Sequence, residues 1–216
     1  HRVMAQPDPL RPNEPTDVEF EHRMRWVRDN FNVMPLEDAG RALSQGKLPR
    51  RALVITFDDG YADNYTRAAP ILKRLGLHAT FFVATAFLDG GLMFNDALIE
   101  ALRQAPAGTL DLNAARMGRY PLGDLYSRRP LIGTLLDGVK YLPQEEREAR
   151  VAQIAAAAQA QLPRDLMMRS DEVAALHAMG MGIGAHTQTH PILTRIGLDA
   201  ARSEIAQGRA RLEEIR

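Results

Sequence analysis

Two runs of apolar residues in the first half of the chain predict buried strands. Residues 53–57 and 79–84 are rich in β-branched and aromatic side chains and lack the alternation of a half-exposed strand. A stretch with helical spacing lies between them and ends near Gly76. This strand–helix–strand order predicts a right-handed βαβ unit with parallel strands.

Further elements are predicted before and after this unit. Thr16 and Glu19 have the spacing of a capping box and predict the start of a helix. A second, short helix is predicted over residues 36–44, and a third strand over residues 181–185. A last helix is expected from about Leu198. The strands and helices therefore alternate, which is typical of the α/β class.

The segment 86–164 interrupts this alternation. It has helical patterns at both ends and a region dotted with glycine and proline between them, so we expect a helical insertion between strands of a single catalytic domain spanning residues 1–216. Residues 1–3 are the expected tail of a strand. The chain begins without an initiator methionine and ends inside a helical pattern. We therefore expect it to lack the C-terminal strands of its domain.

Composition narrows the function classes. The 216 residues include 27 Lys plus Arg and 27 Asp plus Glu, and this balance gives no electrostatic case for nucleic acid or an anionic membrane. No apolar run reaches the roughly 18 residues of a membrane span. The chain has no cysteine, which excludes disulfides, thiolate zinc sites, iron–sulfur clusters and a cysteine nucleophile.

Two neighbouring carboxylates, Asp58 and Asp59, directly follow the predicted strand 53–57. Adjacent strand residues point to opposite faces, so both can converge only if the strand ends here, and Gly60 permits such a turn. Two neighbouring carboxylates repel each other, and a cation relieves this repulsion. One Asp could then ligate a metal while the other acts as a base. The alternative is an Asp-Asp-Gly turn without chemistry.

A second cluster, His186 and His190, follows the predicted strand 181–185. Two histidines four residues apart have a common metal-ligand spacing, although two solvated loop histidines are equally compatible with it. Both clusters lie at the carboxyl ends of predicted strands, where α/β folds build active sites. With Asp59 the histidines would form a three-ligand site with open positions. That pattern is typical of catalytic zinc and also suits iron, cobalt, nickel or manganese.

The segments 56–61 and 186–190 resemble the first two motifs of the polysaccharide deacetylases, the NodB-homology carbohydrate esterases. Their flanking strands agree, and the resemblance covers about residues 50–95 and 165–216. It implies an α/β fold of the NodB-homology type, a distorted and here incomplete (β/α) barrel. The family's later motifs, among them an aromatic-proline strand whose backbone N–H helps to hold an oxyanion, are not in this sequence.

The opening of the chain, followed by a helix and then the Asp-Asp motif, resembles one branch of the family. This branch is the circularly permuted group that includes poly-N-acetylglucosamine deacetylases. The resemblance implies that Asp59, His186 and His190 are metal ligands. It further implies that Asp58 is the catalytic base and His1 the catalytic acid.

The activity implied by this resemblance is metal-dependent removal of N-acetyl groups from an acetamido-sugar polysaccharide, such as a poly-N-acetylglucosamine. Asp58 would activate a water molecule held by one divalent ion, with zinc as the first expectation and cobalt, nickel, manganese or iron as alternatives. We expect an acetylated glycan as partner, no nucleic acid and no membrane span. The resemblance suggests a bacterial envelope polysaccharide or its precursor and leaves periplasm, cell envelope or cytoplasm open, as well as the oligomeric state.

Three other functions share parts of this pattern. A two-His-one-carboxylate set also suits an Fe(II) oxygenase, although an oxygenase needs no second carboxylate such as Asp58. A catalytically inactive carbohydrate-binding module could use the same scaffold. Metal-dependent hydrolysis of another amide, such as a peptide, would share all of the chemistry and differ only in its substrate contacts.

Overall fold

The computed structural model describes residues 1–215, which form two compact units, each with an apolar core of its own. The first unit comprises His1–Pro7, Asn13–Gly91 and the chain from Asp165 onward. The second comprises Asp8–Pro12 and Leu92–Arg164. The interpretation of 86–164 as a helical insertion within one catalytic domain stays a prediction.

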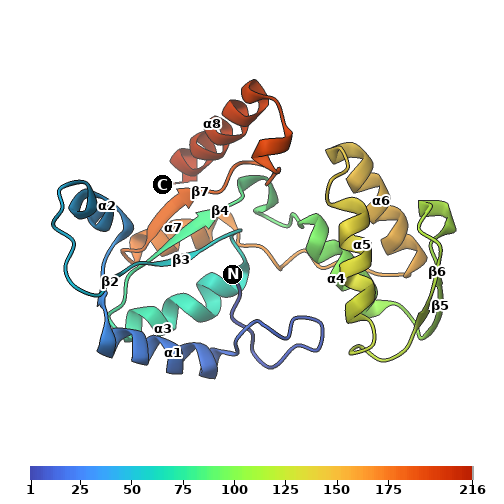
Figure 1. Cartoon of the computed structure of the whole chain (residues 1–216), viewed down its shortest axis with the longest axis horizontal. Coiled ribbons are helices and arrows are strands. Elements are labelled where there is room, and N and C mark those ends of the chain that lie inside the picture. The colour runs from blue at the N-terminus through green and yellow to red at the C-terminus, as the bar shows by residue number, and fades with distance from the viewer. Residues whose placement is uncertain (216) are drawn as a thin grey trace. The chain divides into compact units, whose positions relative to one another are not determined.

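The first unit contains a three-stranded parallel sheet in the order β3-β4-β7 (Figure 1). Its strands are β3 (Ile55–Phe57), β4 (Ala79–Val83) and β7 (Gly182–Ala185). A π-helical turn, η1 (Asn64–Ala68), runs directly into α3 (Ala69–Arg74) between β3 and β4. The mixed α/β class and the parallel βαβ unit are confirmed. The sheets formed by residues 1–215 are open, and the NodB-type barrel stays a prediction.

The apolar run predicted as one strand over 53–57 is divided between two sheets. Its first residue belongs to β2 (Ala52–Leu53), which pairs in parallel with β1 (Asn32–Val33). The remainder forms β3, which pairs with β4. Val54 is the point at which the segment changes partner, and a sequence pattern carries no signal for such a change.

Helices α1 (Asp17–Asn30) and α2 (Leu36–Ser44) precede the sheet, as predicted. The capping box of α1 is formed: the Glu19 N–H donates to Thr16 Oγ1 over 3.3 Å, and the Thr16 N–H donates to the Glu19 carboxylate over 2.8 Å. Phe20 of α1 is buried and packs edge-on against Phe57 of β3. Local capping thus starts α1, and Phe20 packs the helix against β3.

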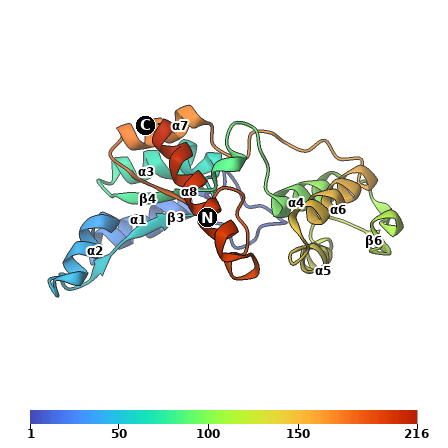
Figure 2. The same cartoon turned by 90° about the horizontal axis from the view of Figure 1, so that it is seen from above.

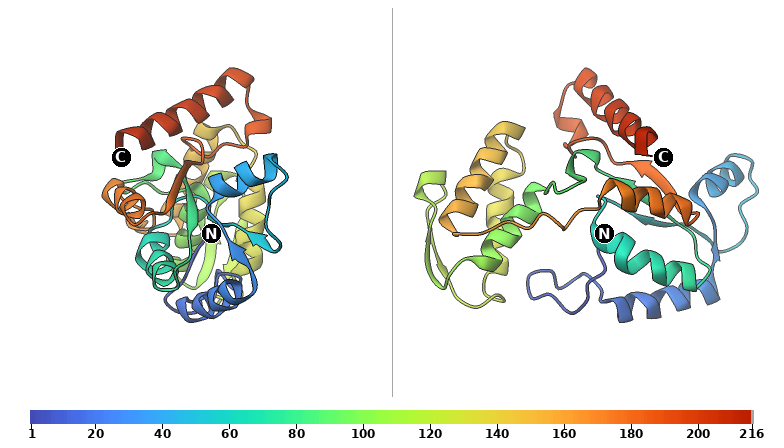
Figure 3. Two further views of the ribbon diagram at one scale, coloured as in Figure 1. Left: turned by 90° about the vertical axis from the view of Figure 1, so that its left-hand side faces the viewer. Right: turned by 180° about the vertical axis from the view of Figure 1, so that it is seen from behind.

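Other helices pack around the same sheet. Both α7 (Ser170–Ala178) and α8 (Leu198–Ile215) contact β7, while α1 and α3 lie side by side (Figure 3). Phe57 and Phe81 stack with ring centroids 4.9 Å apart and fill the core of this unit. No helix formed by residues 1–215 is both long and apolar enough to cross a bilayer.

The prediction of a strand over residues 1–3 is wrong. These residues are irregular, and only Met4 forms an isolated bridge, with Thr16. The reason is that side chains satisfy the backbone of this segment: the Val3 N–H donates to the Asp63 carboxylate over 3.2 Å. No ladder of a neighbouring strand is needed to satisfy that donor.

The second unit combines helices with one hairpin (Figure 2). Its elements are α4 (Phe94–Gln104), β5 (Gly108–Asp111), η3 (Asn113–Ala115), β6 (Arg119–Leu122), α5 (Arg129–Val139) and α6 (Gln144–Ala157). The strands β5 and β6 pair antiparallel. Leu98, Leu102, Leu135 and Ile154 are fully buried and form the centre of its core.

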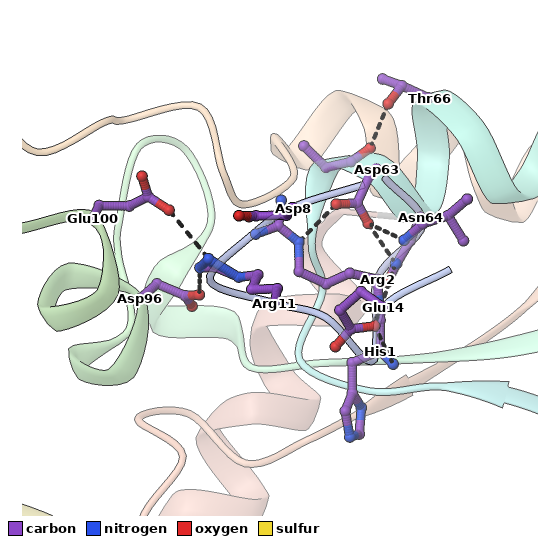
Figure 4. Close-up of polar contacts among 12 residues, drawn as sticks. His1, Arg2, Asp8, Arg11, Glu14, Asp63, Asn64, Thr66, Asp96 and Glu100 are labelled. Atoms are coloured by element: carbon purple, nitrogen blue, oxygen red, sulfur yellow. Dashed lines mark hydrogen bonds and ion pairs between the residues drawn. The ribbon is translucent and has the colours of Figure 1, made fainter. Parts of the chain in front are cut away.

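Buried ion pairs attach the segment Asp8–Pro12 to α4. Arg11 donates to Asp96 over 2.6 Å and to Glu100 over 3.1 Å (Figure 4), and Arg103 donates to Asp8 over 2.6 Å. Burial acts to raise the pKa of Asp8, but hydrogen bonds from Arg103 and a backbone N–H outweigh it and hold that pKa below its usual value. This early segment therefore belongs to the second unit.

Candidate functional site

The turn after β3 carries Asp58 and Asp59. Asp59 has φ 78° and Gly60 has φ 91°, so the chain enters the left-handed region and the alternation of the strand ends. A Cβ atom on Gly60 would lie 2.9 Å from a methyl group of Val83, so glycine is required by space as well as by conformation. The Ala84 N–H donates to the Asp59 carbonyl over 3.1 Å, which fixes this turn against the end of β4.

The loop after β7 carries His186 and His190. The His186 N–H donates to the Val83 carbonyl over 2.9 Å, which continues the pairing of β7 with β4. Thr187 and His190 adopt positive φ values of 65° and 55°, and the His190 N–H donates to Thr187 Oγ1 over 3.1 Å. The loop therefore curls back, and the two imidazole rings lie with centroids 4.9 Å apart.

These two turns bring Asp59, His186 and His190 together. The Asp59 Oδ1 atom lies 3.5 Å from Nε2 of each histidine. The Asp59 side chain is mostly buried at 12% exposure, while the two imidazoles are about one-third exposed at 34% and 37%. Burial raises the pKa of Asp59, and the neighbouring Asp58 carboxylate acts in the same direction, whereas the two imidazoles oppose the shift. The site thus combines one buried carboxylate with two imidazole nitrogens that are accessible to solvent.

The donor set fits a divalent cation. Zinc ligands lie about 2.1 Å from the ion, so tetrahedral ligands lie about 3.4 Å from one another, close to the separations of the Asp59 oxygen from both imidazoles. One oxygen and two imidazole nitrogens are also the donors that catalytic zinc and related ions use. In the part of the chain that the structure describes, the His, Cys, Asp and Glu side chains whose ligand atoms lie within 4.8 Å of one another in groups of three or more are those of Asp59, His186 and His190.

Asp58 and His1 form a second pair beside this group. His1 Nδ1 lies 3.4 Å from Asp58 Oδ2, and both side chains are open to solvent. The His1 backbone is held in turn, because Asn64 Nδ2 donates to the His1 carbonyl over 2.8 Å. The structure thus brings all five residues singled out in the sequence to the ends of β3 and β7, with His1 reaching Asp58 from an irregular segment rather than from a strand.

Residues that fix the start of the chain were not identified in the sequence. Arg2 Nε donates to Asp63 over 2.7 Å, and its guanidinium lies over the Tyr61 ring at 4.7 Å. Figure 4 shows Arg2, Asp63 and Asn64 gathered at the start of the chain, with the His1 ring pointing away from them. Burial raises the pKa of Asp63 although Arg2 opposes this.

Part of the chain is similar in sequence to known proteins. Residues 45–109 match the family of polysaccharide deacetylases. A putative polysaccharide deacetylase, YxkH of Bacillus subtilis, is 45% identical over 67 residues, which cover 30% of this chain and 24% of that protein. The poly-beta-1,6-N-acetyl-D-glucosamine N-deacetylase of Staphylococcus epidermidis is 32% identical over 71 residues, or 32% of this chain and 25% of the relative. The matched segments thus span about a quarter of each relative's length.

Solved structures share the fold. The deacetylase PplD of Streptococcus pyogenes, in complex with acetate, superimposes with a TM-score of 0.59 at 17% identity and covers 100% of this chain and 66% of its own. IcaB from Ammonifex degensii gives a TM-score of 0.54 at 16% identity, with 99% and 66% covered. Residues 45–109 are thus similar in sequence to the polysaccharide deacetylases, and the chain shares its fold with two solved deacetylase-type structures.

Proposed function

We propose that this protein removes N-acetyl groups from an acetamido-sugar polysaccharide in a hydrolysis that depends on a divalent metal ion. The observation that carries the proposal is the convergence of Asp59 Oδ1 with Nε2 of His186 and His190, each at 3.5 Å. The neighbouring pair of Asp58 and His1 supplies the groups for proton transfer. The match to polysaccharide deacetylases supports the reaction class.

Asp59, His186 and His190 are the residues that would hold the ion. At such a site a divalent cation supplies Lewis-acid polarisation and lowers the pKa of a coordinated water. The two imidazoles are partly exposed, so substrate can approach the ion from the solvent side. The Asp59 carboxylate is buried and would bind the ion from the protein side. Zinc is our first expectation, because two imidazoles and one carboxylate form a ligand set of catalytic zinc sites.

Asp58 acts as the general base. It lies next to Asp59 in sequence, but its side chain is outside the three-residue group and remains one-third exposed. From that position it can accept a proton from the attacking water, while His1 donates a proton to the departing amine. His1 Nδ1 and Asp58 Oδ2 are 3.4 Å apart, so both groups are close enough to serve one reacting amide.

The relatives indicate the substrate class. One relative carries a poly-beta-1,6-N-acetyl-D-glucosamine deacetylase name, and we take an acetylated glucosamine polymer as the first substrate to test. Four side chains of the site, those of His1, Asp58, His186 and His190, are each about one-third exposed or more, which is compatible with a polymer that passes across the surface. We also propose that residues 1–216 work as one catalytic domain in which segment 86–164 is an insertion.

The test is acetate release from β-1,6-linked N-acetylglucosamine oligomers by the purified protein loaded with Zn²⁺. The proposal expects acetate in stoichiometric balance with new amino groups, and an equal rate with and without O₂. Chitin oligomers, which differ only in linkage, and an acetylated peptide serve as matched substrates. Release from the peptide alone would assign the site to another amide hydrolysis, and a reaction that requires O₂ would favour the Fe(II) oxygenase alternative.

A further inference from the structure

The loop that carries the two histidines is held by a carboxylate from a distant helix. Glu204 lies on α8 and its Oε2 atom accepts hydrogen bonds from the backbone N–H groups of Gln188 and Thr189, each over 2.8 Å. Its Oε1 atom accepts a third bond, from Thr189 Oγ1, over 2.6 Å. One half-buried side chain therefore satisfies three donors of the segment between His186 and His190.

The backbone of the same loop is also packed closely against α8. A Cβ atom on Gly208 would lie 2.7 Å from the Thr187 carbonyl oxygen and 3.3 Å from the Gln188 nitrogen. Glu204 and Gly208 are four residues apart, so they lie on one face of the helix. The missing side chain at Gly208 lets the loop approach, and the carboxylate of Glu204 binds it there.

Backbone groups also hold the loop, from a second segment of the chain. The Ala86 N–H donates to the Gln188 carbonyl over 2.9 Å, from the short 3₁₀ helix η2 (Thr85–Phe87). Meanwhile Thr187 and His190 adopt left-handed conformations that residues other than glycine rarely occupy. Such a conformation persists only where surrounding contacts impose it. Beside the Thr187 hydroxyl bond within the loop, Glu204 supplies side-chain hydrogen bonds from outside it.

We propose that Glu204 is a positioning residue that keeps the His186–His190 loop in the conformation in which both imidazoles face Asp59. This inference rests on the proposed function, since it assigns Glu204 to the same metal site. Glu204 binds the loop between the two histidines rather than the histidines themselves. It acts through the two backbone N–H groups and the threonine hydroxyl, so its removal changes ligand geometry and leaves the ligand set intact.

The variants Glu204→Ala and Glu204→Gln separate hydrogen bonding from charge. Alanine removes all three acceptor contacts. Glutamine keeps an oxygen for the two N–H donors and turns its NH₂ group to the Thr189 hydroxyl, which can accept a hydrogen bond. Glu213→Ala is the matched control, because Glu213 is an exposed carboxylate on the same helix that pairs with Arg209 and lies outside this loop contact.

Two measurements test the inference, and the first needs no metal. In metal-free protein, amide hydrogen exchange of Gln188 and Thr189 should accelerate in Glu204→Ala, remain close to wild type in Glu204→Gln, and be unchanged in Glu213→Ala. In the second, Zn²⁺ affinity from competition with a chromophoric chelator should fall by about 10- to 100-fold in Glu204→Ala, the usual effect of losing a group that orients metal ligands. Glutamine should restore most of that affinity.

Wild-type exchange rates and wild-type Zn²⁺ affinity in Glu204→Ala would overturn the inference. If Glu204→Ala does not fold, Glu204→Asp decides, because it keeps the charge while the shorter side chain withdraws the carboxylate from the loop. Faster exchange at positions 188 and 189 then supports the inference, and unchanged rates overturn it. If the wild-type protein binds no Zn²⁺, the proposed function fails, while the exchange data still decide whether Glu204 holds the loop.

Discussion

Replacing Arg2 with methionine should destabilise the first unit by about 3 kcal/mol at neutral pH, because it leaves the buried Asp63 carboxylate without its cation. Both side chains are only 9% exposed, and the Arg2 Nε to Asp63 distance is 2.7 Å. The change also removes the contact of the guanidinium with the Tyr61 ring. The penalty arises mainly from an uncompensated buried charge, which costs more than the ion pair itself contributes.

The assay is urea unfolding followed by the fluorescence of Trp26, the chain's single tryptophan, which lies on α1 of the same unit. With a slope of about 2 kcal/mol per M, a loss of about 3 kcal/mol moves the midpoint down by about 1.5 M. The double variant Arg2→Met/Asp63→Asn removes both charges. It should recover most of the lost stability.

The pH dependence supplies an independent check of the cause. Burial raises the pKa of Asp63 above its usual 3.8, and the loss of Arg2 raises it further. A carboxyl whose pKa is raised on folding stabilises the fold below its unfolded pKa, and that contribution is lost as the pH rises through the folded pKa. The penalty of Arg2→Met should therefore shrink as the pH falls toward about 4. A midpoint within error of wild type at pH 7, or a penalty that grows on acidification, would refute the reasoning.

Three further results are expected from single substitutions. Gly60→Ala places a Cβ 2.9 Å from Val83 at a φ of 91° and should cost about 2 kcal/mol of stability, read from thermal unfolding; an unchanged melting temperature would show that the turn relaxes freely. Thr16→Ala removes the helix cap and should cost about 1 kcal/mol, whereas Thr16→Ser should be nearly neutral in the same assay. Asp8→Asn should destabilise the second unit at neutral pH, because the hydrogen bonds from Arg103 and a backbone N–H hold the pKa of Asp8 below its usual value of 3.8. In an acid titration the difference from wild type should shrink as the pH falls below about 3.8 and vanish once the pH has passed the lowered pKa of the folded protein; a difference that does not shrink would contradict the assignment.

Local patterns in the sequence were sufficient for most of the first unit. Apolar runs and helix caps depend on neighbouring residues, so the parallel strands and α1 could be predicted from them. Asp58 and His186 were identifiable because polar residues directly after a buried strand lie at its carboxyl end. The spacing of His186 and His190 then indicated a shared site. These predictions share one physical basis, since each depends on a few consecutive residues.

Features that depend on contacts between residues far apart in the chain could not be predicted from the sequence. The Arg2–Asp63 pair joins positions 61 residues apart and replaces the predicted strand with an irregular segment. Glu204 contacts a loop 15 and 16 residues earlier through backbone N–H groups, which every residue type offers. The hairpin of β5 and β6 lies in a region whose glycines and prolines hid its alternation. The Arg2–Asp63 and Glu204 contacts are tertiary and have no local signature, whereas the hairpin pairs two neighbouring segments of the chain.

The most direct test of the central claim compares metal content with turnover in two adjacent variants. Wild type, Asp58→Asn and Asp59→Ala are purified in parallel, their metal is quantified by mass spectrometry, and acetate release from N-acetylglucosamine oligomers is measured on the same samples. The account predicts about one divalent ion in wild type and in Asp58→Asn, with turnover in Asp58→Asn reduced by about 10²-fold or more. It predicts neither metal nor acetate from Asp59→Ala. Equal metal content in Asp59→Ala and wild type, or wild-type turnover in Asp58→Asn, would contradict it.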